Sequence, residues 1–419
     1  MSGTFALPEN PDYGLRDSAR DSVRFAHRCL EPIEGGRWRA ISTFVDPEAR
    51  PQPWHDFGPL EGPGWAANAL GGAYLLYAWS AFDHCHLLLH VALGLLDHVL
   101  DDGFIESNGL IWGYRHVVSN ERCLNFKQNS EWLCPGSMAR VGLQALWMAD
   151  LLADGDPRRE RLHACAANAA RWIIGTVTEV DGWYPRRCTP SGVPYERSAE
   201  GGPDPQFSSS GDGYHIPWLL LELNDRGLPA DLEHARQRLN TAVARGIFGS
   251  VNHDTYDDDE NVARAVAFRT CLRAARTLGD ERYRAFAYEA ALAGLDRFKM
   301  TEDRNGVATT GLLFMEDSWD TAYLWENAEA ALAYIEAFED TRDRNFLCWA
   351  VTILRAIAKH HYGSLGFLTE GVDWNNHVGS QHHVSEAEFG AIRYTEPLLN
   401  NLHHIEAVMR VMRLTESCE

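Results

Sequence analysis

Basic residues are scarce in this sequence relative to acidic ones. Its 419 residues include 38 lysines and arginines against 59 aspartates and glutamates, which gives a net charge of -21 at pH 7. A surface this acidic repels phosphate backbones and anionic headgroups. We therefore expect no nucleic acid and no membrane among the partners. An anionic substrate would need a local cluster of arginine, lysine or histidine.

Paired cysteines and long apolar runs are also missing. The nine cysteines are scattered and form no Cys-x-x-Cys motif, which argues against a disulfide framework or a thiolate zinc site. No apolar window reaches the roughly 18 to 20 residues that a transmembrane helix needs. The first residues show no secretory signal pattern, so we expect a cytoplasmic protein. Without a glycine-rich phosphate loop or a dinucleotide fingerprint, we expect no cofactor.

Helical periodicity dominates what is present, and the strand-like runs are few and short. Apolar residues recur at helical spacing in paired segments that are broken by short turns such as Asp-Gly-Asp-Pro. The expected helical pairs are, in chain order, 65–103, 137–180, 214–249, 259–298 and 318–363. Single helices are expected at 17–31 and 395–414. If these two pair, six hairpins form a closed all-α ring, one domain over residues 1–419.

The connections between the expected helices are of two kinds. Turns within a hairpin are short, as is usual between packed helices, whereas the links between hairpins are long and carry glycine-aromatic or tryptophan motifs. In an antiparallel helical ring all of the long links emerge on the same face. We expect this face to carry the binding residues, because loops held by a rigid scaffold commonly do so.

This organisation resembles the (α/α)6 toroids of the six-hairpin glycosidase superfamily. The resemblance covers nearly the whole chain but is architectural, without a family-specific motif, so it assigns no residue a role. Members of that superfamily include inverting glycoside hydrolases, unsaturated glucuronyl hydrolases, sugar 2-epimerases and, with added domains, polysaccharide lyases. The resemblance therefore implies a carbohydrate substrate, here an oligosaccharide, but leaves the reaction open.

Aromatic residues in the long links agree with a sugar substrate. The C–H faces of sugar rings stack on indole, and nearby polar groups bind the hydroxyls. The tryptophans in question are Trp65, Trp112, Trp132, Trp183, Trp319 and Trp374. The alternative is that these side chains pack the ends of the helical ring.

Carboxylates in the same links are candidates for glycosidic cleavage, which needs one carboxylic acid and one carboxylate. They are Asp212, Glu316, Asp317, Asp320, Glu370 and Asp373. Asp317 and Asp320 would also fit the N-cap and first turn of the following helix, and Asp212 an ordinary turn. Glu370 or Asp373 is the first choice for the acid/base group, with Asp212 or Asp317 as its partner.

Histidines are concentrated in the link 366–397, which carries His377, His382 and His383. They could transfer protons, bind sugar hydroxyls or a carboxylate, or pack within the link. A metal site is the weaker interpretation, because their spacing matches no strong zinc motif. Tyr214 and His215 at the start of a helix could be acid/base groups or could pack the helix end.

Basic residues near the link tryptophans suggest a substrate that carries a carboxylate. Arg115, His116 and Arg186 stand out, since guanidinium groups bind carboxylates in a bidentate manner. Surface salt bridges would explain the same residues.

The leading hypothesis is an exo-acting glycoside hydrolase on short oligosaccharides, uronic-acid-containing ones included. One alternative is a sugar epimerase, an isomerase or a lyase that uses histidine and tyrosine for proton transfer. The other is a glycan-binding protein without activity. The sugar, the linkage and the oligomeric state stay open.

Overall fold

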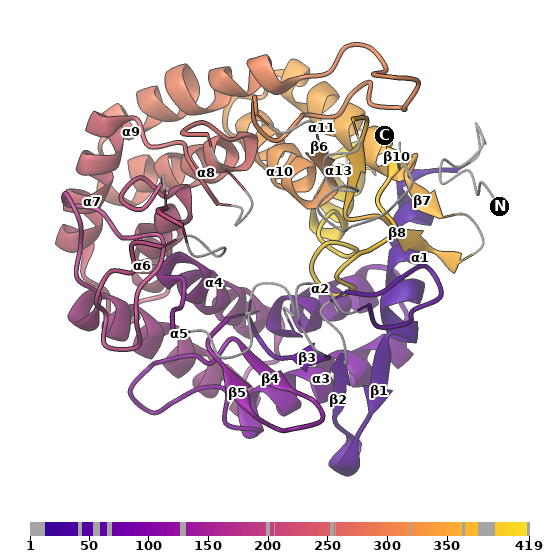
Figure 1. Cartoon of the computed structure of the whole chain (residues 1–419), viewed down its shortest axis with the longest axis horizontal. Helices are drawn as coiled ribbons and strands as arrows, with labels where there is room; N and C mark the ends of the chain where they lie inside the picture. The colour runs from indigo at the N-terminus through magenta and orange to yellow at the C-terminus, as the bar shows by residue number, and fades with distance from the viewer. Residues whose placement is uncertain are drawn as a thin grey trace.

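The computed structural model describes residues 13–40, 44–52, 59–64, 69–125, 131–197, 202–204, 206–251, 255, 257–318, 321–362, 365–375 and 390–416. Its helices form two concentric layers around an axis (Figure 1). The inner helices are α2 (Ala69–Phe82), α4 (Pro135–Leu151), α6 (His215–Asp225), α8 (Asn261–Leu278), α10 (Leu324–Thr341) and α13 (Ile405–Glu416). Each inner helix contacts the next, and α13 contacts α2, so the ring is closed.

The outer layer consists of the helices that follow or precede the inner ones. They are α1 (Leu15–Arg28), α3 (His86–Asp101), α5 (Pro157–Thr176), α7 (Leu232–Arg245), α9 (Glu281–Phe286) and α11 (Arg344–Ala358). A π-helical stretch, Ala287–Leu292, and the 3-10 turn Leu295–Phe298 extend α9. This architecture confirms the expected (α/α)6 toroid. The assignment of residues 1–419 to one domain remains a prediction.

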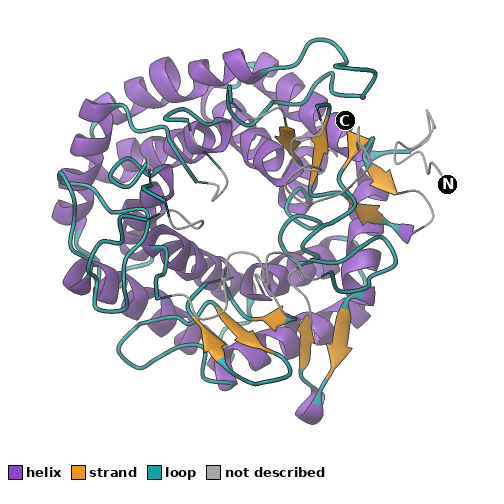
Figure 2. Cartoon of the chain, viewed as in Figure 1, coloured by secondary structure: helices purple, strands orange, loops and turns teal. Residues whose placement is uncertain are grey.

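The strands are short and belong to the long links (Figure 2). β1 (Leu30–Pro32) pairs with β2 (Trp38–Ala40), and β7 (His361–Tyr362) with β8 (Phe367–Leu368). A second group is β3 (Leu60–Glu61), β4 (Tyr114–His116) and β5 (Arg122–Cys123). A third is β6 (Thr321–Tyr323), β9 (Gly371–Asp373) and β10 (Gly390–Ala391). All of these pairs are antiparallel, and they fold the links back on themselves.

Inner and outer helices begin on opposite faces of the ring, and their first turns are capped differently. The outer helices α5, α7, α9 and α11 begin after short turns with an aspartate N-cap whose side chain accepts a backbone N–H. These aspartates are Asp156, Asp231, Asp280 and Asp343. The inner helices α4, α6, α8 and α10 begin after long links and have no such side-chain cap. All inner helices therefore start on the face where the long links emerge. We call this face the mouth.

Two helix boundaries differ from the sequence-based prediction. α10 begins at Leu324, not near 318, because residues 321–323 pair with β9 as strand β6. The last helix begins at Ile405, not at 395. The carboxylate of Glu396 accepts the backbone N–H groups of Leu398 and Leu399 and holds the preceding turn. In the part of the chain that the structure describes, no helix is long and apolar enough to cross a membrane.

Buried histidines predict loss of stability in acid. Burial lowers the pKa of His360 to about 4 and that of His404 to about 3. The native state therefore stays unprotonated at pH values where the unfolded chain takes up protons, near 6.5 and below. We expect the free energy of unfolding to fall from pH 6.5 toward pH 4, by up to about 1.4 kcal/mol per pH unit for each histidine.

Urea unfolding between pH 7.5 and 4.5 measures this slope. The Nε2 atom of His360 lies 2.9 Å from the carbonyl oxygen of Ala308. His360→Gln keeps a donor for this carbonyl but cannot take up a proton, so its slope should be shallower than that of the unaltered protein. Equal slopes for the two proteins would contradict the assignment.

Candidate functional site

Asp212 lies at the mouth, where the first turn of α4 approaches the start of α6. The 3-10 turn Gly211–Tyr214 leads into α6 and carries this aspartate. A Cβ atom on Gly136, in the first turn of α4, would lie 2.2 Å from the backbone oxygen of Asp212 and 2.4 Å from its Oδ2. Only glycine permits this approach. The position of Asp212 is thus fixed by close backbone packing between two inner helices.

His215 is oriented by Asp212. Its Nδ1 atom lies 3.1 Å from Oδ1 and 3.0 Å from the backbone oxygen of Asp212, and both side chains are buried. Ser137 donates its hydroxyl to Oδ2 at 3.4 Å. With Nδ1–H donated to the carboxylate, Nε2 is the basic nitrogen, and it has no hydrogen-bond partner among the described residues. Such a pair can accept and return a proton.

A network of charged groups continues from the mouth along the axis of the ring. We call Arg140, Arg269, Glu329 and His403 the axial network. Glu329 accepts from Arg140 at 3.2 Å and lies 2.9 Å from Nε2 of His403, and it also pairs with Arg269. Burial alone would raise the pKa of Glu329, but Arg269, His403 and Arg140 outweigh it and hold the pKa well below its usual value. Asp212 in turn acts electrostatically on Arg140, which connects the network to the mouth.

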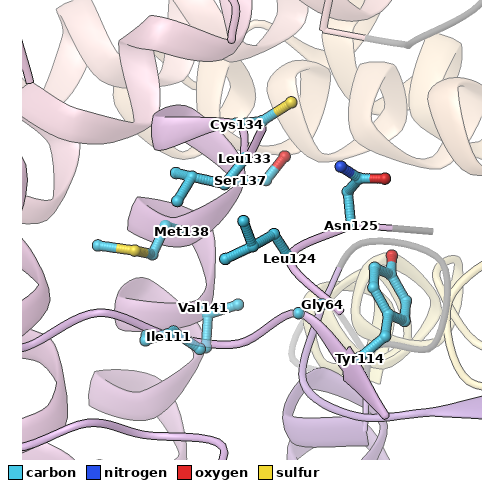
Figure 3. Close-up of a pocket in the computed structure, with 11 residues that line it drawn as sticks. Gly64, Ile111, Tyr114, Leu124, Asn125, Leu133, Cys134, Ser137, Met138 and Val141 are labelled. Atoms are coloured by element: carbon cyan, nitrogen blue, oxygen red, sulfur yellow. The ribbon is translucent and has the colours of Figure 1, made fainter. Parts of the chain in front are cut away.

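A cavity of about 40 Å³ lies beside Ser137, between α4 and the link strands (Figure 3). Polar side chains of Tyr114, Asn125 and Ser137 line it together with apolar ones. The apolar lining comes from Ile111, Leu124, Leu133, Met138 and Val141. Hydroxyl and amide groups beside an apolar surface suit one edge of a sugar ring.

The other carboxylates predicted from the sequence lie in different surroundings. Glu370 is buried and accepts from the side-chain amide of Asn400 at 2.9 Å. The Oδ1 atom of Asp373 accepts the backbone N–H of Asn375 at 2.9 Å and holds a turn. Asp317 is mostly exposed and pairs with Arg297. Its predicted N-cap role is wrong, because β6 separates it from α10, and the same position gives no support to a catalytic role.

The described tryptophans of the long links are packed against the protein and do not project into open space at the mouth. Trp183 is fully buried, donates its indole N–H to the backbone oxygen of Ser210 at 2.8 Å, and meets the buried ring of Tyr214 edge to face. Trp374 is buried beneath Arg304. For these residues the packing interpretation replaces the predicted sugar stacking. Trp112 is half-buried and donates to Glu106.

The basic residues predicted to bind a carboxylate already have partners within the chain. Arg115 pairs with Glu61 at 2.7 Å and with Asp102 at 3.0 Å. Arg186 pairs with Asp204, and both side chains are buried. The Nδ1 atom of His116 accepts the backbone N–H of Ser119. The salt-bridge interpretation therefore fits both arginines, and the case for a uronate substrate loses its support from them.

Six predicted residues, Trp65, Trp319, Asp320, His377, His382 and His383, lie outside the described residues and remain predictions. Among the residues that are described, no group of three or more histidine, cysteine, aspartate or glutamate side chains is placed to hold a metal ion.

Sequence reasoning missed the axial network. The missed signal was a charged residue at a buried position of an inner helix. Arg140 in α4, Arg269 in α8 and Glu329 in α10 are such residues, and all three are buried. A buried charge needs a partner, so three of them on inner helices indicate a shared network.

No family model and no curated protein matches this sequence. Solved structures match nearly its whole length. A sugar epimerase from a ruminal bacterium is similar with a TM-score of 0.63 and 15% identity, over 95% of this chain and 98% of that one. Cellobiose 2-epimerase from Bacillus thermoamylovorans B4167 is similar with a TM-score of 0.65 and 12% identity, over 95% of this chain and 99% of that one. A D-mannose isomerase is similar with a TM-score of 0.62 and 12% identity, over 98% of this chain and 100% of that one.

Other matches extend the range of reactions found on this fold. They include an unsaturated glucuronyl hydrolase specific for heparin, a polysaccharide lyase and a family 76 glycoside hydrolase, with TM-scores of 0.57 to 0.60. At 10 to 16% identity, these likenesses show the fold, the toroid of six-hairpin glycosidase-like enzymes.

Proposed function

From a toroid whose structural matches include sugar epimerases and an isomerase, we propose that this chain is a carbohydrate-active enzyme that transfers a proton on a reducing sugar. The reaction is aldose–ketose isomerisation or epimerisation at C2. The observation that carries this proposal is the Asp212–His215 pair at the mouth, with 3.1 Å between Oδ1 and Nδ1. The proposal replaces the leading hypothesis from the sequence, because the predicted paired carboxylates lie in separate surroundings.

The chemistry needs one base beside the open-chain sugar. Nε2 of His215 takes the proton from C2, the C–H electron pair forms a C1=C2 double bond, and the carbonyl oxygen at C1 takes the negative charge. Asp212 stabilises the positive charge that the imidazole acquires. Return of the proton to C1, with the proton of the 2-hydroxyl moving to O1, gives the ketose. Epimerisation needs a proton on the opposite face of C2, which His215 can deliver once the enediolate has turned over beside it.

Glycoside hydrolysis is the second candidate, and the carboxylate of Asp212 favours it. A buried carboxyl group at the mouth of a toroid, held by Ser137 and a neighbouring histidine, would also suit protonation of a leaving oxygen. Hydrolysis requires a second carboxylate across the substrate, and the buried candidates from the sequence are Glu316, Glu370 and Asp373.

Proton transfer can be tested by solvent exchange. The protein is incubated with D-mannose, D-glucose or cellobiose in D2O, and the C2 proton and the product sugars are followed by NMR. We expect loss of the C2 proton signal together with a new ketose or epimer, and His215→Asn should abolish both. Tyr77→Phe, on the inner helix α2, serves as the control and should retain the activity.

New reducing ends from oligosaccharides, with no exchange at C2, would overturn proton transfer in favour of hydrolysis. An exchange rate that His215→Asn leaves unchanged would overturn the assignment of the base.

A further inference from the structure

A second cavity opens on the face of the ring opposite the mouth. It has a volume of about 330 Å³, and we call it the lower cavity. All six inner helices contribute to its lining. For α4 and α10, the lining residues lie near the helix end that leads into the short turn. Representative residues are Tyr74 of α2, Trp147 of α4, Trp218 of α6, Arg273 of α8, Glu336 of α10 and Arg410 of α13. None of these takes part in the chemistry proposed at the mouth.

One side of the lower cavity is aromatic. The rings of Tyr74 and Trp147 have centroids 5.9 Å apart, and those of Trp147 and Trp218 are 5.8 Å apart. Trp218 donates its indole N–H to Glu222 at 3.1 Å. In contrast, the hydroxyl of Tyr74 and the indole N–H of Trp147 have no hydrogen-bond partner among the described residues. This side therefore offers an apolar surface with two polar groups that the described chain leaves without a partner.

The other side is charged but internally paired. Arg273 lies 2.6 Å from Glu222, and Arg269 lies 3.0 Å from Glu336. Arg410 pairs with Glu336 at 3.3 Å and with Glu339. An anionic ligand would have to displace a carboxylate from its arginine, and a cationic ligand would have to do the reverse. Hydroxyl groups can bind both kinds of side chain without breaking these pairs.

A ligand that fits both sides is neutral, has an apolar face and carries several hydroxyls. A sugar ring has these properties, since its C–H face stacks on aromatic rings and its edge is polar. We propose that the lower cavity is a second carbohydrate site, for a neutral mono- or disaccharide. Its lining includes neither Asp212 nor His215, although the ring of Trp218 stacks on that of His215 with 6.2 Å between their centroids. The proposal does not depend on the reaction at the mouth.

Binding can be observed directly at Trp147. The protein, labelled with ¹⁵N at its tryptophan indoles, is titrated with D-mannose and with cellobiose, and the indole resonance of Trp147 is assigned with Trp147→Phe. The titration uses Asp212→Asn, so that turnover at the mouth does not change the sugar. We expect this resonance to shift and saturate with one of the two sugars at millimolar concentration. No shift of the resonance with either sugar would overturn the proposal.

A pair of tyrosine variants tests where the sugar binds. Tyr74→Phe removes only the hydroxyl in the lower cavity and should weaken binding about fivefold. Tyr334→Phe is the matched control, because the hydroxyl of Tyr334 is buried without a hydrogen-bond partner among the described residues and lies outside the lining of the cavity. Equal affinities of the two variants would overturn the assignment. A loss of C2 proton exchange, by contrast, tests only the function proposed at the mouth and not the second sugar site.

Discussion

Replacing Asp212 with asparagine is expected to lower kcat/KM for sugar turnover by about 10²- to 10⁴-fold. Asparagine can keep the hydrogen bond to Nδ1 of His215, which is 3.1 Å long, but it removes the negative charge that stabilises the protonated imidazole. If hydrolysis is the reaction, the same change removes the proton donor. The initial rate of C2 proton exchange measures proton transfer, and the initial rate of reducing-end release measures hydrolysis.

Asp317→Asn is the matched control for this prediction. Asp317 has the same side chain and was also a catalytic candidate from the sequence, but it is mostly exposed and pairs with Arg297. Its rate should stay within about twofold of the unaltered protein, since surface ion pairs contribute little. If Asp317→Asn lost activity and Asp212→Asn kept it, the site would have to be moved to the link that precedes β6.

Replacing Glu329 with glutamine should give the largest loss of stability, about 3–5 kcal/mol. The change removes the carboxylate that pairs with two buried arginines, Arg140 and Arg269, and leaves Arg269 with Glu336. Because Arg140 is on α4, Arg269 on α8 and Glu329 on α10, loss of this shared charge loosens contacts between inner helices across the ring. Urea unfolding followed by circular dichroism measures the free energy of unfolding.

Glu31→Gln is the control for this loss. Glu31 is also paired with an arginine, Arg39, but its side chain is 45% exposed. Its removal should change the free energy of unfolding by less than about 1 kcal/mol. Similar losses for the two variants would contradict the prediction, because the buried Glu329 would then contribute no more to stability than the exposed Glu31.

The toroid could be predicted from the sequence because its signals are local. Helical periodicity marks each hairpin, and the contrast between short turns and long links places every inner helix start on one face. The errors in boundaries have a non-local cause. Nothing near residues 321–323 shows that they pair with residues 371–373, nor that Glu396 holds the turn before α13.

The candidate site could be predicted only in part. Asp212 and His215 are three residues apart at a helix start, so the sequence alone brings them together. The axial network unites residues from α4, α8, α10 and α13, and which of them meet depends on the rotation of each helix about its own axis. The sequence left both sugar stacking and packing open for the tryptophans, for a related reason. Burial of Trp183 and Trp374 is decided by neighbours that are distant in the sequence.

The inner helices that begin without a side-chain cap have an electrical consequence. The N-terminal end of a helix carries the equivalent of about half a positive elementary charge, and acidic side chains lie beside four of these ends. They are Asp212, before α6 and against the first turn of α4, Glu260 at the N-cap of α8, and Glu326 in the first turn of α10. These starts converge on the mouth, so positive helix ends and carboxylates offset one another there, within a chain whose net charge is -21. The mouth therefore repels an approaching anion less than the outer surface does.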